Sequence, residues 1–221
     1  DEKARQVLRK NWPITPIFED VRTLNKELLD EQGVNDIRLI CGGYPCQPFS
    51  LAGQWRGTKD NRHLWPEMFR LVQEIRPAWV VGENVAGHIT MGLDEVLADL
   101  EAANYSTRSF VIPACAVDAR HQRDRVWIIA RSLADTHGSW ELQQKRREQE
   151  ERGWTSYSCE IVANTYSKFC QNWPTEPSVG RVADGVPNRT HRLKQLGNAV
   201  VPQVVQVIGE MIMQVEREQA A

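Results

Sequence analysis

Residues 37–50 read Ile-Arg-Leu-Ile-Cys-Gly-Gly-Tyr-Pro-Cys-Gln-Pro-Phe-Ser, and this stretch decides the fold. The apolar run at its start predicts a short buried strand, which two glycines end. Two prolines then stiffen the backbone around Cys46. Active sites of open α/β sheets form at the carboxyl ends of strands, so Cys46 stands where a nucleophile is expected. A buried structural cysteine in a turn is the competing interpretation.

The rest of the chain alternates between predicted helices and strands. Apolar spacing and capping residues predict helices over residues 2–10, 20–29, 64–75, 93–103 and 200–215. Short apolar runs predict strands over residues 37–41, 78–81, 106–112 and 125–130. This order predicts an α/β fold with a mostly parallel sheet and a late hairpin. Asp20 is the predicted cap of the second helix, and Gly33 is its predicted stop.

The composition excludes several classes of protein. With 221 residues, 41% of them hydrophobic and 25% charged, the chain can bury one sizeable core and is not wholly disordered. A net charge of -2 does not point to nucleic acid, although a local basic patch can still bind phosphates. The five cysteines form no C-x-x-C pair, so we expect reduced thiols and no metal site. No apolar run approaches the roughly 18 residues of a membrane span, so we expect a cytoplasmic protein.

Charged residues mark two further segments. Glu83 comes directly after the strand predicted over residues 78–81, where a carboxylate is costly to bury unless it is paired. It is a candidate acid or hydrogen-bond partner, and a helix cap or an ion pair is the alternative. Alternation puts Arg123 and Arg125 on the same face of an extended segment. Two guanidinium groups suit the recognition of an anion or a base edge, and solvated charges at a strand end are the alternative.

These segments together resemble the cytosine-5 DNA methyltransferase family, especially its bacterial and phage-type members. The matching motifs are Pro45-Cys46-Gln47-Pro48-Phe49-Ser50, Glu83-Asn84-Val85, Gln122-Arg123-Asp124-Arg125 and Gln195-Leu196-Gly197-Asn198-Ala199-Val200. The resemblance implies a Rossmann-like S-adenosylmethionine-dependent methyltransferase fold with a small variable target-recognition region. We expect a catalytic domain over residues 1–130, the variable region over 131–180 and a return to the catalytic domain over 181–221.

The resemblance also implies a covalent mechanism. Cys46 would add to carbon 6 of cytosine, which makes carbon 5 nucleophilic toward the methyl group of S-adenosylmethionine. Glu83 would hydrogen-bond ring nitrogen 3 and the exocyclic amine. Arg125 would contact the ring oxygen, and Arg123 would support the site and its loop. A target carbon inside a duplex is hidden, so the cytosine would be flipped out of double-stranded DNA.

Further residues fall at family positions for DNA and cofactor. The segment from Gln47 to about His63 would be a mobile loop that closes on DNA, and a plain solvated loop is the alternative. Its candidate DNA contacts are Gln47, Ser50, Gln54, Arg56, Lys59 and Arg62. The candidate cofactor contacts are Asp20, Pro45, Leu64, Asn198 and Val200. For Asp20, helix capping is a competing and compatible role.

One departure from the family concerns the N-terminal side of the chain. The family begins with a strand and a glycine-rich turn that cradles the cofactor, and neither is present here. We therefore expect that the natural protein has an additional segment of about two strands, or that a second chain supplies it; otherwise we expect a monomer. A non-catalytic or partner-dependent DNA-binding fragment is the alternative function. An unrelated cysteine hydrolase would need His63 or His121 as its base, and the paired arginines would then have no role.

Overall fold

The structure is a computed structural model that describes residues 2–45, 64–134 and 197–220. The chain divides into two units, residues 1–111 with 125–136 and residues 112–124 with 137–221. Within the described residues, no helix is both long enough and apolar enough to cross a membrane. The predicted variable region, residues 131–180, lies almost wholly outside the described residues, so its boundaries stay a prediction.

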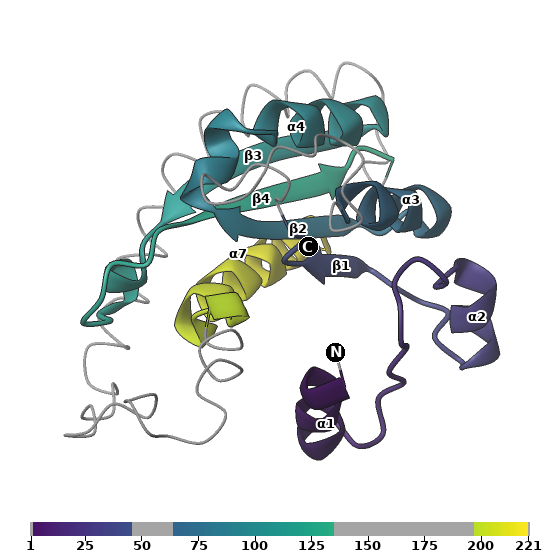
Figure 1. Ribbon diagram of the computed structural model, residues 1–221. Coiled ribbons are helices and arrows are strands. Elements are labelled where there is room, and N and C mark those ends of the chain that lie inside the picture. Colours follow the sequence, from purple (N-terminus) through teal and green to yellow (C-terminus); the bar gives the residue numbers. More distant parts are fainter. Residues whose placement is uncertain (1, 46–63, 135–196, 221) are drawn as a thin grey trace. The chain divides into compact units, whose positions relative to one another are not determined.

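The described strands of the first unit form a mixed sheet in the order β1-β2-β4-β3 (Figure 1). They are β1 (Leu39–Gly42), β2 (Trp79–Val85), β3 (Tyr105–Ile112) and β4 (Arg125–Ser132). Strands β1 and β2 are parallel, whereas β2 and β4 are antiparallel. The prediction of a mostly parallel sheet is therefore wrong for the described strands. Strands β3 and β4 are neighbours, as the predicted hairpin requires.

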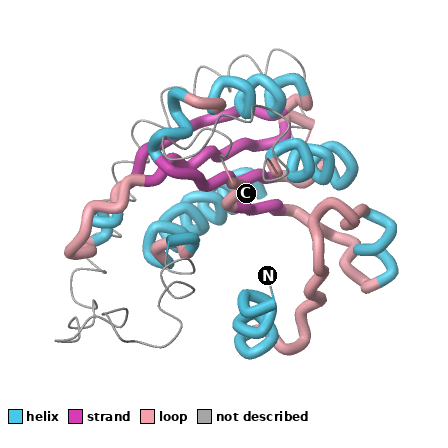
Figure 2. The backbone as a smooth tube through the Cα atoms, viewed as in Figure 1, coloured by secondary structure: helices cyan, strands magenta, loops and turns pink. Residues whose placement is uncertain are grey.

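Figure 2 shows the helices of the first unit in cyan, and all but the second α-helix lie close to their predicted places. The helices are α1 (Glu2–Asn11), α2 (Lys26–Glu31), α3 (Trp65–Ile75) and α4 (Leu93–Ala102), with a short 3₁₀ helix, η2 (Ala86–Thr90).

The predicted start of α2 is wrong. Residues 20–24 form turns, because the Thr23 amide donates to the Asp20 carbonyl at 3.2 Å. Asn25 is the actual cap, and its side chain accepts from the Leu28 amide at 2.8 Å. Gly33 follows the helix with a φ of 74°, which confirms it as the stop.

The core of the first unit lies between one face of the sheet and helices α3 and α4. Alternate residues of β2 and β4 point to this face, as the pleat requires. The Trp65 indole of α3 donates to Asp99 of α4 at 2.7 Å, which joins the two helices. The buried residues of the cluster are Tyr44, Trp65, Met68, Val72, Val80, Leu93, Val96, Leu100, Ala103, Tyr105, Val126, Ile128 and Ala130.

Strand β1 is not the buried strand that its apolar residues predict. Leu39 is 44% exposed, and the Cys41 side chain is also exposed. The reason is topological: among the described strands, β1 lies at the edge of the sheet and pairs with β2 alone. Apolar β-formers indicate a strand, but burial depends on what covers it.

In the second unit, the described elements are a 3₁₀ helix, η3 (Ala114–Val117), and the long helix α7 (Pro202–Ala220). Helix α7 confirms the predicted C-terminal helix, with Pro202 as its first residue, where a missing amide hydrogen costs least. Val204, Val207 and Ile208 are buried on one side of α7.

The burial of the core predicts that two truncations in the first unit lower the free energy of unfolding by different amounts. Leu100→Ala should lower the free energy of unfolding by about 2–5 kcal/mol, because Leu100 is fully buried and its truncation leaves a cavity. Val7→Ala, at a residue 51% exposed on α1, should change it by less than about 0.5 kcal/mol. Urea unfolding of both variants measures the difference. Equal unfolding midpoints would contradict the assigned core.

Candidate active site

The candidate site begins where β1 ends beside the middle of β2. Gly42 and Gly82 are the last pair of the parallel ladder, so the next residues of the two segments come close together. A Cβ atom built on Gly43 would lie 3.0 Å from Oε2 of Glu83. Any side chain at residue 43 would therefore displace the carboxylate. Gly43 lets the backbone that leads to Cys46 approach Glu83 directly.

Glu83 lies inside strand β2 and does not follow it. The strand was predicted to end at residue 81, but it continues to Val85 because its partners in β4 continue. Glu83 is opposite Trp127 in the antiparallel ladder, and its carboxylate is held by a diagonal neighbour. Oε1 of Glu83 lies 2.9 Å from Nε of Arg125, and the two side chains are 15% and 19% exposed. The ion pair offsets much of the cost of removing both charges from water.

Arg123 lies outside the extended strand that begins at Arg125, so the alternation that was expected to put both side chains on one face does not apply. The φ of Arg123 is 41°, so its backbone is left-handed. Within the second unit, Nη2 of Arg123 donates to the carbonyl oxygen of Gly197 at 2.8 Å and to that of Ala199. These charge-assisted hydrogen bonds hold the backbone of Gly197 and Ala199. Both residues belong to the matched motif of residues 195–200, the closing motif.

The sequence analysis assigned no role to three buried residues with polar side-chain groups, Tyr44, Asn84 and His88. Asn84 points to the opposite face of β2, and its amide donates to the Tyr44 carbonyl at 3.0 Å. The Tyr44 hydroxyl lies 2.9 Å from Nε2 of His88. All three are less than a tenth exposed. Tyr44 and Asn84 stand within or beside the matched motifs, but a lone histidine in a glycine-rich stretch gives no periodic signal.

A cysteine hydrolase would need His63 or His121 as its catalytic base, and the described residues place neither of them beside the candidate site. His121 is exposed in the second unit, and His63 lies outside the described residues. His88 is engaged with the Tyr44 hydroxyl.

The candidate cofactor residues are divided between the two units. In the first unit, Pro45 is exposed after β1, and Leu64 is half-buried at the start of α3. Asp20 is exposed and accepts from the Arg22 amide at 3.0 Å, so its carboxylate shapes a local turn and caps no helix. In the second unit, Asn198 and Val200 are exposed before α7.

The segment around Asp20 is anchored to α1. Arg5 hydrogen-bonds to Glu19, and this bond lowers the pKa of the Glu19 carboxyl. The exposed Asp20 carboxylate therefore lies on a turn next to Glu19, and the ion pair of Glu19 with Arg5 connects this turn to α1.

The predicted nucleophile and DNA contacts lie outside the described residues. These are Cys46, Gln47, Ser50, Gln54, Arg56, Lys59 and Arg62. Their roles stay predictions, and the described residues define what surrounds the backbone up to Pro45.

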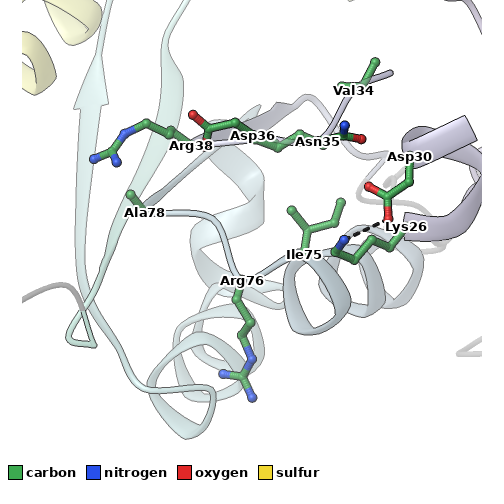
Figure 3. A pocket seen from close by; sticks show the side chains of 10 residues that line it. Lys26, Asp30, Val34, Asn35, Asp36, Arg38, Ile75, Arg76 and Ala78 are labelled. Carbon is green, nitrogen blue, oxygen red and sulfur yellow. Dashed lines mark hydrogen bonds and ion pairs between the residues drawn. The ribbon is translucent and has the colours of Figure 1, made fainter. Parts of the chain in front are cut away.

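A cavity of about 230 Å³ in the first unit lies away from the candidate site (Figure 3). Arg38 and Ala78, which line it, precede β1 and β2, so the cavity is at the amino ends of these strands. Glu83 and Gly43 are at their carboxyl ends. An ion pair of 2.9 Å between Lys26 and Asp30 borders the cavity. None of the predicted site residues that the structure describes lines it.

The partly buried ion pair predicts energetic coupling between Glu83 and Arg125. In a double-mutant cycle with Glu83→Gln and Arg125→Gln, urea unfolding should give a coupling energy of about 0.5–3 kcal/mol. The exposed pair Lys26–Asp30, also 2.9 Å long, is the matched control, and its cycle should give about 0.2–1 kcal/mol. Additive effects at Glu83 and Arg125, or a coupling no larger than the control, would show that the pair is not formed.

The two hydrogen bonds of Arg123 predict that backbone amides of the closing motif are protected from hydrogen exchange. Arg123→Gln removes two charge-assisted hydrogen bonds, so amide hydrogen exchange over residues 197–201 should accelerate. Arg120→Gln, at an exposed arginine of the same unit, should leave the exchange unchanged. Hydrogen exchange read by mass spectrometry measures both. Equal behaviour of the two variants would argue against the contact.

Comparison with known proteins places the chain among DNA methylases. Residues 1–178 match the family model of C-5 cytosine-specific DNA methylases. The chain is 42% identical over 88 residues to the Type II methyltransferase M.NgoMIV of Neisseria gonorrhoeae, covering 39% of this chain and 27% of that protein. It is 33% identical over 153 residues to the Type II methyltransferase M.AquIA of Picosynechococcus sp., covering 62% of each. The chain therefore spans less than two thirds of the length of these relatives.

Solved structures show the same fold at low identity. The S. pombe Dnmt2 methyltransferase matches with a TM-score of 0.51 and 17% identity, covering 82% of this chain and 49% of that chain. A mutant of Spodoptera frugiperda DNMT2 matches with a TM-score of 0.50 and 20% identity, covering 63% and 43%. These matches confirm the predicted Rossmann-like methyltransferase fold. Because the family model spans well over half of the residues, the chain belongs to the C-5 cytosine-specific DNA methylase family.

Proposed function

We propose that this chain carries the base-binding and nucleophile-bearing part of a DNA (cytosine-5)-methyltransferase, which acts on a cytosine flipped out of double-stranded DNA. The observation that carries the proposal is the partly buried pair of Glu83 and Arg125, 2.9 Å apart, beside the backbone that leads to Cys46. A carboxylate and a guanidinium on one face of a sheet offer both an acceptor and donors to the edge of a pyrimidine ring.

The chemistry follows from the needs of the cytosine ring. The Cys46 thiolate adds to carbon 6, and the electron pair of the carbon 5–carbon 6 double bond becomes available at carbon 5. The Glu83 carboxyl accepts a hydrogen bond from the exocyclic amine and, in its protonated form, donates one to ring nitrogen 3, while Arg125 donates to the ring oxygen; the donated hydrogen bonds stabilise the negative charge that develops on the ring. After methyl transfer, loss of the carbon 5 proton expels the thiolate and restores the aromatic ring.

S-adenosylmethionine supplies the methyl group as an electrophile bound to a sulfonium. The exposed groups that would hold it are chemically suitable: the Asp20 carboxylate can accept from an amine, and the Asn198 amide can pair with polar edges. Pro45, Leu64 and Val200 offer apolar surface to a nucleoside, and Val200 is 42% exposed. Arg123 contributes by fixing the backbone on either side of Asn198.

Double-stranded DNA is the proposed partner. The candidate contacts Gln47, Ser50, Gln54, Arg56, Lys59 and Arg62 include three basic residues suited to phosphates, which would offset the slightly negative charge of the whole chain. The chain matches the family model of C-5 cytosine-specific DNA methylases, which supports DNA as the substrate class.

Trapping of the covalent adduct tests the proposal. The natural protein that carries this sequence is incubated with S-adenosylmethionine and duplex DNA in which cytosine is replaced by 5-fluorocytosine. Fluorine cannot leave as a proton does, so an adduct stable in detergent gel electrophoresis should accumulate. Cys46→Ala should abolish it, and Glu83→Gln should slow its formation by about 10²-fold or more.

The controls separate chemistry from binding. Cys115→Ala removes an exposed thiol of the second unit and should leave adduct formation unchanged. Retarded DNA migration without any adduct, across duplexes of varied sequence, would instead favour a non-catalytic DNA-binding role. An adduct that persists in Cys46→Ala would refute the assigned nucleophile.

A further inference from the structure

Tyr44 is fixed at three points just two residues before Cys46. Its carbonyl oxygen accepts from the Asn84 amide at 3.0 Å. Its ring packs against Trp65, with ring centroids 5.0 Å apart. Its hydroxyl lies 2.9 Å from Nε2 of His88. Backbone, ring and hydroxyl of Tyr44 are therefore held by different parts of the first unit.

Two glycines, Gly82 and Gly92, leave room for the rings of Tyr44 and His88. A Cβ atom built on Gly82 would lie 3.3 Å from the Tyr44 ring, and one built on Gly92 would lie 3.3 Å from the His88 ring. Gly92 also has a φ of 141°, which other residues rarely adopt. Both rings of the hydrogen-bonded pair thus fill gaps that the backbone leaves for them.

Core packing alone does not account for the polar atoms of this pair. Tyr44 is 6% exposed and His88 is 4% exposed, and burying a hydroxyl and an imidazole costs free energy unless they are hydrogen-bonded. A phenylalanine would fill nearly the same volume as Tyr44 without that cost. What the hydroxyl adds is a directional bond, which selects one position of the ring.

The pair connects the two segments that must meet in the reaction. Pro45 is the only residue between Tyr44 and Cys46, and its ring fixes one backbone dihedral and restricts that of Tyr44 as well. On the other side, His88 lies in η2, which begins directly after strand β2. Strand β2 carries Glu83. The hydrogen bond therefore ties the backbone leading to Cys46 to the segment that carries Glu83.

We propose that Tyr44 and His88 are positioning residues for the proposed methyltransferase reaction, which hold the backbone before Cys46 in register with Glu83. This inference rests on the proposed function and deepens it. A displacement of about 1 Å in a reacting group can cost roughly 10²-fold in rate, so the loss of one hydrogen bond at this place should be visible in the rate of thiol addition.

The test compares two tyrosines that each lose a buried hydroxyl. Tyr44→Phe should slow adduct formation with 5-fluorocytosine DNA by about 10- to 100-fold at saturating DNA, with the affinity for DNA unchanged. Tyr105→Phe is the matched control, because the Tyr105 hydroxyl donates to the Pro77 carbonyl at 2.8 Å, at the amino end of β2. Both variants should lose similar stability, but Tyr105→Phe should keep the rate of the unmodified protein.

Substitutions of His88 provide a rescue. In His88→Gln the side-chain amide can take the place of Nε2, so the rate should largely recover, whereas His88→Leu should be as slow as Tyr44→Phe. The double variant Tyr44→Phe with His88→Leu should be no slower than either alone, since one bond is lost in all three. Amide hydrogen exchange of Cys46 and Gln47 should accelerate in Tyr44→Phe and not in Tyr105→Phe.

The outcomes separate this inference from the function on which it rests. If the unmodified protein forms no adduct, the proposed function fails and the positioning role fails with it. If the unmodified protein forms the adduct but Tyr44→Phe matches its rate, or Tyr105→Phe is slowed equally, the function stands and the positioning role is overturned.

Discussion

Glu83 and Arg125 hold opposite charges on neighbouring antiparallel strands, and both are largely withdrawn from water. Each would be costly to bury alone, and together they are tolerated because the β2–β4 ladder sets them diagonally across from each other. The ladder therefore has to continue through Glu83 to Val85. This requirement fixes the length of β2, the start of β4 and the face on which the candidate site lies.

The opposite face of β2 carries the second half of the arrangement. Glu83 points to one face beside Gly43, whereas Asn84 points to the other and holds Tyr44. A single strand thus lies against two consecutive residues, Gly43 and Tyr44, of the segment that leads to Cys46, and it holds the second by a hydrogen bond. The core between the sheet and helices α3 and α4 supports this face, so stability of the first unit and geometry of the site depend on the same packing.

The sequence predicted elements and motifs better than it predicted their surroundings. Periodicity located α3 and α4, because burial of one face determines the pattern of a helix, and short apolar runs located β3 and β4. It misplaced the cap of α2 and the end of β2, since the first depends on local turns and the second on a partner strand far away in the chain. The left-handed backbone of Arg123 and the buried His88 left no sequence signal, because both follow from tertiary contacts.

A crystal structure of the covalent complex with 5-fluorocytosine DNA is the most direct test of the account. In that structure we expect a bond from Cys46 Sγ to carbon 6, with the Glu83 carboxyl group about 2.6–3.2 Å from ring nitrogen 3 or the exocyclic amine. Arg125 should contact the ring oxygen while it still faces Glu83. A flipped cytosine bound elsewhere, with Glu83 and Arg125 paired only to each other, would contradict the central claim.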